Sequence, residues 1–107
     1  MIACPKCRQS MFRGRHAGTE VDLCSGCHGV WLDRSELAAI TGKPVDLPES
    51  QPGTATTFTC PRCPGPLRER PYAGRSDILI ECCSGCEGIY LDQGELLMIK
   101  ELAKSEG

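Results

Sequence analysis

Four Cys-x-x-Cys pairs are the feature that most constrains how this chain can fold. They are Cys4/Cys7, Cys24/Cys27, Cys60/Cys63 and Cys83/Cys86. The second and fourth pairs open nearly the same segment, because residues 24–37 read CSGCHGVWLDRSEL and residues 83–96 read CSGCEGIYLDQGEL. One such pair is a weak signal. Two pairs separated by a loop, with the whole arrangement repeated, predict two four-cysteine metal sites.

The length of the chain makes the metal part of the fold. Its 107 residues give two repeats of roughly 40 residues, a size at which apolar burial alone seldom suffices. A structural zinc ion supplies about 10–16 kcal/mol of apparent binding free energy per site. We therefore expect two Zn²⁺ per chain, with iron in a similar four-thiolate site as the rival metal. Such a site has no open coordination position, so we expect no hydrolytic enzyme.

The cysteine count indicates a cellular compartment, and the net charge bears on nucleic-acid binding. Nine cysteines, an odd number, argue against a closed disulfide framework. Paired thiols kept as ligands are typical of a reducing cytosol, so we expect a cytoplasmic protein. No apolar segment approaches the ~18 residues of a membrane span. The formal net charge of −2 becomes about −6 once eight thiolates hold two Zn²⁺, which disfavours non-specific nucleic-acid binding.

Both repeats are expected to have the same local structure. A tight Cys-Pro-x-Cys turn is followed by an antiparallel hairpin, and a short apolar strand follows the second cysteine pair. The expected strands are residues 11–13, 20–23 and 30–32 in the first repeat and residues 67–70, 78–82 and 89–91 in the second.

Each repeat should close with a helix that begins at a D-x-x-E capping box. The two boxes are Asp33/Glu36 and Asp92/Glu95, which we assign to capping rather than to catalysis. The first helix should end near residue 40, before a glycine. The second should run from about residue 93 to 103, with Leu96, Ile99 and Leu102 on one apolar face.

The repeats divide the chain into residues 1–42, a linker at 43–59 that is rich in Pro, Gly and Thr, and residues 60–107. A linker of this composition is extended or flexible. It could join two independent units or let them fold back on each other, and the sequence does not decide between these arrangements.

Comparison of the repeats removes two residues from the ligand set. His28 follows Cys27, but its counterpart is Glu87, which favours an exposed polar role. Cys82 aligns with Leu23, an apolar strand position, so we expect it to pack as a small hydrophobic residue.

Two features could contact a partner. Trp31 and Tyr90 stand at matched positions and are expected to cover the metal turns, with an exposed binding anchor as the alternative. The predicted hairpins carry basic residues, which we expect to be solvated beside acidic neighbours, with phosphate contact as the alternative. These basic residues are Arg8, Arg13, Arg15, His16, Arg68, Arg70 and Arg75.

Each repeat contains, in order, Cys-Pro-x-Cys, a hairpin and Cys-x-x-Cys-x-Gly-Val/Ile-Trp/Tyr-Leu-Asp-x-x-Glu-Leu. This pattern resembles the TFIIB-type zinc-ribbon family, also called the transcription factor zinc-finger domain, in two tandem copies. The second copy differs by Tyr90 in place of Trp and by Cys82 before its second pair. The resemblance implies a small metal-stabilised α+β fold of two zinc ribbons. Each would be a zinc-knuckle β-hairpin with a short third strand, followed by a helix. It also implies contact with transcription machinery or nucleic acid.

These observations predict a zinc-binding, non-enzymatic protein-interaction module or adaptor linked to transcription. Its second helix is the expected docking surface for a protein partner or for another copy of the chain. One alternative is a nucleic-acid-binding regulator that uses the Arg-bearing hairpins. A second alternative is a redox-sensing or iron-binding thiolate protein.

Overall fold

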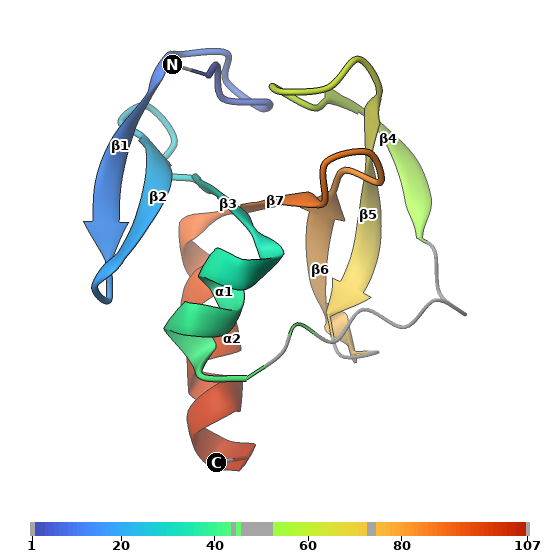
Figure 1. Ribbon diagram of the computed structural model, residues 1–107. Helices are drawn as coiled ribbons and strands as arrows, with labels where there is room; N and C mark the ends of the chain where they lie inside the picture. Colours follow the sequence, from blue (N-terminus) through green and yellow to red (C-terminus); the bar gives the residue numbers. More distant parts are fainter. Residues whose placement is uncertain (1, 44, 46–52, 73–74, 107) are drawn as a thin grey trace.

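Seven strands form one antiparallel sheet in the order β1-β2-β3-β7-β6-β5-β4 (Figure 1). The computed structural model describes residues 2–43, 45, 53–72 and 75–106. Its elements are β1 (Met11–His16), β2 (Thr19–Cys24), β3 (Val30–Asp33), α1 (Arg34–Thr41), β4 (Thr54–Thr59), β5 (Pro66–Tyr72), β6 (Arg75–Cys82), β7 (Gly88–Leu91) and α2 (Gln93–Glu106). Every strand and helix expected from the sequence is present, and the small α+β fold is confirmed.

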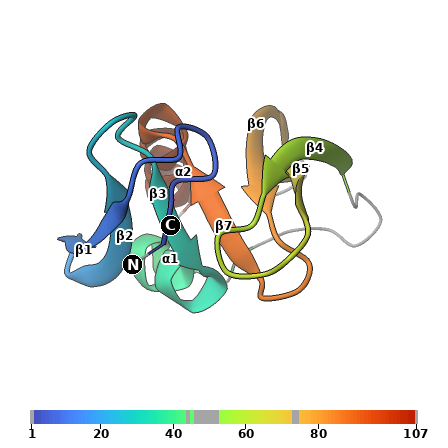
Figure 2. The same ribbon diagram turned by 90° about the horizontal axis from the view of Figure 1, so that it is seen from above.

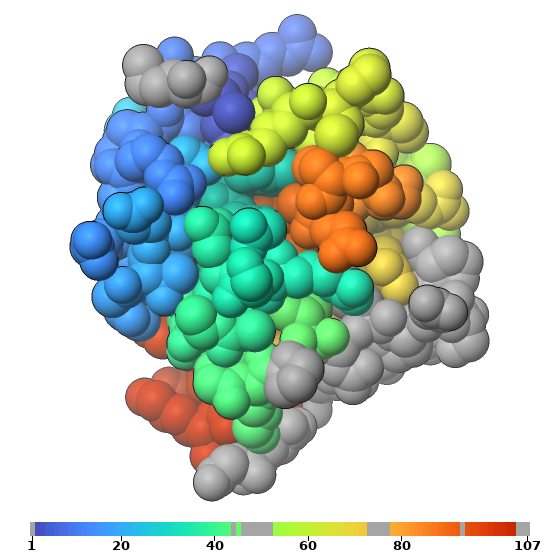
Figure 3. All heavy atoms as spheres, viewed as in Figure 1, coloured from blue at the N-terminus to red at the C-terminus, as the bar shows by residue number. Residues whose placement is uncertain are grey.

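The two repeats meet at the centre of the sheet, where β3 pairs antiparallel with β7. The register places Trp31 opposite Tyr90 and Leu32 opposite Ile89. A hairpin flanks this junction on each side, β1–β2 on one and β6–β5 on the other, so the arrangement is close to two-fold symmetric (Figure 2). Of the two arrangements that the linker allows, the chain adopts the one in which the repeats fold back on each other, and their atoms are in contact in Figure 3.

One strand of the sheet lies in the segment expected to be linker. Residues 54–59 form β4, which pairs with β5 through Thr54 opposite Glu69 and Thr59 opposite Pro66. The segment TATTFT is rich in β-branched residues and has no proline, both of which favour a strand. The Thr56 hydroxyl also donates to the Leu67 carbonyl at 2.8 Å. Residues 44 and 46–52 of the expected linker lie outside the described residues.

The sheet is covered on both faces near the junction. Alternate residues of a strand point to opposite faces, so Val30 and Leu32 face one way and Trp31 the other. Val30 and Leu32 belong to the core between the sheet and the two helices, whereas Trp31 and Tyr90 belong to a second core that contains buried cysteines. Figure 1 places the helices below the junction and the cysteine turns above it.

Both capping boxes are formed. The Glu36 N–H donates to Asp33 Oδ1 at 2.8 Å, and the Asp33 N–H donates to Glu36 Oε1 at 3.1 Å. The matching distances for Asp92 and Glu95 are 2.7 and 3.0 Å. Gly42 ends α1 in the left-handed conformation, with φ of 76°.

The apolar face expected to dock a partner is used inside the protein. Leu96 and Ile99 are buried in the core, and Leu102 packs against it. The exposed apolar residues of α2 are instead Leu97 and Met98. The docking surface predicted from helical periodicity was therefore wrong, because that periodicity marks the face toward the sheet. In the described ranges, neither helix is long and apolar enough to cross a membrane.

Candidate metal centres

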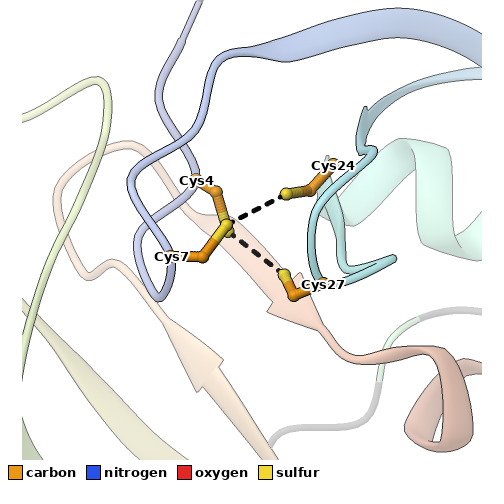
Figure 4. Close-up of side chains that lie close together, drawn as sticks. All are labelled: Cys4, Cys7, Cys24 and Cys27. Carbon is orange, nitrogen blue, oxygen red and sulfur yellow. Dashed lines mark hydrogen bonds between the residues drawn. The ribbon is translucent and has the colours of Figure 1, made fainter.

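The first cysteine group gathers sulfurs from the start of the chain and from the end of β2. Cys4 Sγ lies 3.5 Å from Cys27 Sγ, and Cys7 Sγ lies 3.2 Å from Cys24 Sγ. All four ligand atoms lie within 4.8 Å of one another. Figure 4 shows the four side chains pointing into one point between the two turns.

The second group has the same construction. Cys60 Sγ lies 3.6 Å from Cys86 Sγ, and with Cys63 and Cys83 the four sulfurs again lie within 4.8 Å of one another. The backbone N–H groups of Arg62 and Cys63 each approach Cys60 Sγ at 3.3 Å. Burial raises the pKa of the Cys60 thiol to about 12, and these two contacts act in the opposite direction by favouring the thiolate, the form that binds metal.

Three of the four Cys-x-x-Cys turns are followed by a residue in the left-handed conformation. His28 N–H donates to the Cys24 carbonyl at 2.9 Å, and Arg8 N–H donates to the Cys4 carbonyl at 2.9 Å. Both donors have positive φ, 63° for His28 and 66° for Arg8, and Glu87 has φ of 60° at the position matching His28. His28 is exposed and completes the turn.

Four sulfurs at these separations fit zinc. A tetrahedral site with Zn–S bonds of about 2.3 Å has sulfur–sulfur edges of about 3.8 Å. The measured separations lie slightly below this value, and thiolates are the donors that zinc accepts in closed structural sites. Within the described residues, these two groups have metal-ligand geometry, and each can hold one zinc ion.

Comparison with known proteins gives the same result. The family described as "Transcription factor zinc-finger", of the TFIIB-type zinc ribbon, matches residues 3–42 and 59–102, which together make up most of the chain. The protein belongs to the TFIIB-type zinc-ribbon family. Residues 3–42 are ribbon one and residues 59–102 are ribbon two. No curated protein and no solved structure matches the chain significantly.

Cys82 stands beside a member of group two but is not part of it. It is buried in the core beneath the helices, with Leu23 of ribbon one packed against the same core. Burial raises the pKa of its thiol to about 12, which keeps it protonated. The expectation that Cys82 packs as a small hydrophobic residue is confirmed.

Trp31 and Tyr90 cover the metal turns, and each covers the turn of the other ribbon. Tyr90 Oη lies 3.1 Å from Cys27 Sγ, and a side chain at Gly29 would overlap the phenol. In the same way, a side chain at Gly88 would overlap the Trp31 ring. Both aromatic residues are buried, with exposures of 2% and 1%. The alternative of an exposed binding anchor is therefore wrong.

The contact with Tyr90 changes the acidity of both partners. Burial, and then the two sulfurs of Cys27 and Cys4, raise the pKa of the Tyr90 phenol well above its ordinary value. Burial of Cys27 opposes ionisation, but hydrogen bonds led by the Tyr90 phenol lower the pKa of this thiol to about 7. A metal-bound thiolate carries no proton, so in the zinc-loaded protein the phenol donates and the sulfur accepts.

Ion pairs also cross between the ribbons at matched positions. Lys6, in the first turn of ribbon one, pairs with the buried Glu81 of β6. Arg62, in the first turn of ribbon two, lies 3.5 Å from the buried Asp22 of β2. Lys6 Nζ also lies 5.2 Å from the centroid of the Tyr90 ring. The sequence analysis did not predict these ion pairs, although Asp22 and Glu81 occupy equivalent positions when the two repeats are aligned.

Two arginines of hairpin one are held in ion pairs within the molecule. Arg13 lies 3.2 Å from Asp22, 3.2 Å from Glu20 and 3.6 Å from Glu36. Arg15 lies 3.7 Å from Glu20. The expectation of acidic neighbours is met for Arg13 and Arg15, whereas His16 Nε2 lies 3.0 Å from Lys100 Nζ.

Proposed function

We propose that this zinc-ribbon protein is a non-enzymatic interaction module that works in transcription by binding a protein partner. The observation that carries the proposal is the internal pairing of three basic side chains at the cysteine turns and on hairpin one. Lys6, Arg13 and Arg62 are all paired with carboxylates of the chain itself. Nucleic-acid binding draws its affinity from basic groups that neutralise phosphates, and these side chains have that charge already compensated.

A role without catalysis is supported by the chemistry of the two metal groups. A site with four thiolate ligands keeps no open position for water or substrate. The carboxylates that could serve as general acids or bases beside α1 and α2 are hydrogen-bonded in capping boxes. These groups thus have structural roles.

The outer face of α2 is the surface that we propose for the partner. Leu97 and Met98 are 54% and 41% exposed there, and Glu101 lies one turn further along the same face. Apolar side chains framed by charge suit a protein surface better than a phosphate backbone. The family's description as a transcription factor domain points to RNA polymerase and its factors as the first partners to test.

Binding of labelled protein to purified RNA polymerase, and separately to duplex and single-stranded DNA, tests the proposal. We expect polymerase binding that Leu97→Glu weakens about tenfold or more and that Arg15→Ser leaves unchanged. Affinity for DNA that falls steeply with salt and is reduced by Arg15→Ser would instead support the nucleic-acid-binding alternative. No binding to polymerase would contradict the proposed partner. Sedimentation of the free protein reports whether a second copy occupies the α2 face.

A further inference from the structure

Tyr90 places a hydroxyl from ribbon two on a metal ligand of ribbon one. Its Oη lies 3.1 Å from Cys27 Sγ and 3.8 Å from Cys4 Sγ. Both sulfurs belong to the first cysteine group, whereas Tyr90 lies in β7, next in sequence to the second group. The contact therefore joins one ribbon's side chain to the other ribbon's metal site.

The phenol is held in place from several sides. Pairing of β3 with β7 sets Tyr90 opposite Trp31, and the missing side chain at Gly29 leaves the space that the hydroxyl fills. The Lys6 ammonium lies over the Tyr90 ring and is itself fixed by Glu81. A buried phenol positioned in this way has little freedom to leave the sulfur.

The arrangement is one-sided. Trp31 occupies the matched position in ribbon one and lies against Gly88 of ribbon two, but it has no hydroxyl. The two metal sites therefore differ, although the fold around them is nearly two-fold symmetric, because in the described part of the chain a tyrosine hydroxyl contacts a sulfur only in group one. Group one receives a hydrogen bond from a phenol across the junction, whereas among the described contacts the indole N–H of Trp31 makes no hydrogen bond to a sulfur of group two.

We propose that Tyr90 is an outer-sphere ligand of the metal in ribbon one, supplied by ribbon two. A hydrogen bond to a thiolate stabilises the thiolate over the thiol, which is the form that binds metal, and fixes the orientation of the ligand. Loss of an outer-sphere partner typically costs about 10–100-fold in metal affinity. Tyr90 thereby makes the stability of the first metal site depend on the folding of the second ribbon.

The test compares full-length protein with Tyr90→Phe, which removes only the hydroxyl, and with Tyr72→Phe. Tyr72 is the other tyrosine of the chain and lies buried in the core between the sheet and the helices. In ¹¹³Cd-loaded protein, Tyr90→Phe should shift the cadmium resonance that correlates with Cys4 and Cys27 and leave the other resonance in place. Zinc affinity of group one should fall about tenfold in competition with a chelator, and that of group two should not. Tyr72→Phe should change neither.

Unchanged resonances and affinities in Tyr90→Phe would overturn the proposal. Should that variant fail to fold, wild-type protein supplies a second measurement. A cadmium-filtered proton spectrum should show the Tyr90 hydroxyl proton coupled to the metal through Cys27 Sγ, and absence of this coupling would also overturn the proposal. Wild-type protein that takes up no metal would overturn the zinc assignment and this proposal together, whereas the two results above overturn the role of Tyr90 alone.

Discussion

At the scale of single residues, two neighbouring cysteines have opposite roles. Cys83 contributes its sulfur to group two, whereas Cys82 is buried beneath the helices. Successive strand residues point to opposite faces, and these two straddle the end of β6. The sequence already separated them, because Cys83 keeps the Cys-x-x-Cys spacing and Cys82 aligns with a leucine.

Substitution of each cysteine should separate these roles. Cys82→Ala should keep two zinc ions per chain and lower the free energy of unfolding by about 1 kcal/mol, because it removes only a small buried group. Cys83→Ala should lose one zinc ion per chain. Metal content after gel filtration, with denaturant unfolding, measures both effects. Loss of zinc from Cys82→Ala with retention in Cys83→Ala would exchange the two assignments.

Glu95 gives a prediction about pH. Burial, and then the nearby carboxylates of Glu81 and Asp92, raise its pKa from 4.5 to about 7. An acid with a raised pKa in the folded state holds its proton more tightly when folded, so its ionisation removes stability as pH rises through this window. Glu95→Gln keeps an acceptor for the Asp92 N–H but cannot ionise.

We therefore expect Glu95→Gln to be more stable than wild type at about pH 8, with a smaller difference at about pH 6. Denaturant unfolding of zinc-loaded protein at the two pH values measures the difference. A gain that grows as pH falls would contradict the raised pKa. Glu36→Gln, at the matched position of α1, is the control.

At the scale of elements, local sequence signals predicted what local interactions determine. The cysteine turns, the hairpins and the starts of both helices follow from spacing, alternation and capping residues within a few positions of each other. Strand β4 was missed because its threonines lie between proline-rich residues and ribbon two, and composition alone favoured a linker. Its pairing with β5 depends on contacts such as that from Thr56 to Leu67.

The N-cap of α1 should contribute measurably to stability. Asp33→Ala removes the acceptor for the Glu36 N–H and should lower the free energy of unfolding by about 1 kcal/mol. Asp33→Asn keeps an acceptor and should cost less. Denaturant unfolding of the two variants checks the order, and equal losses would show that capping is not the cause.

At the scale of the whole molecule, the two ribbons depend on each other. The junction pairs Trp31 with Tyr90, and the ion pairs of Lys6 and Arg62 cross it in opposite directions. None of this was readable from one repeat, because every crossing contact joins residues distant in sequence. Comparison of the repeats identified Trp31 and Tyr90 as equivalent positions. The β3–β7 register determines that each of these side chains contacts the other ribbon.

Gly88→Ala tests this dependence. Its added methyl group would overlap the Trp31 ring, so the junction must shift and the free energy of unfolding should fall by about 1–3 kcal/mol. Gly65→Ala is a matched control in ribbon two, since a methyl group there meets no atom within 4 Å. Its effect should stay within about 0.5 kcal/mol. Similar stability losses in both variants would argue against close packing at the junction.

The central claim is that two closed four-thiolate zinc sites hold this molecule together. X-ray absorption at the zinc edge of the purified full-length protein, with the metal quantified on the same sample, tests it most directly. We expect about two zinc ions per chain, each with a first shell of four sulfur atoms at about 2.3 Å. A first shell that contains nitrogen or oxygen, or iron in place of zinc, would contradict the account.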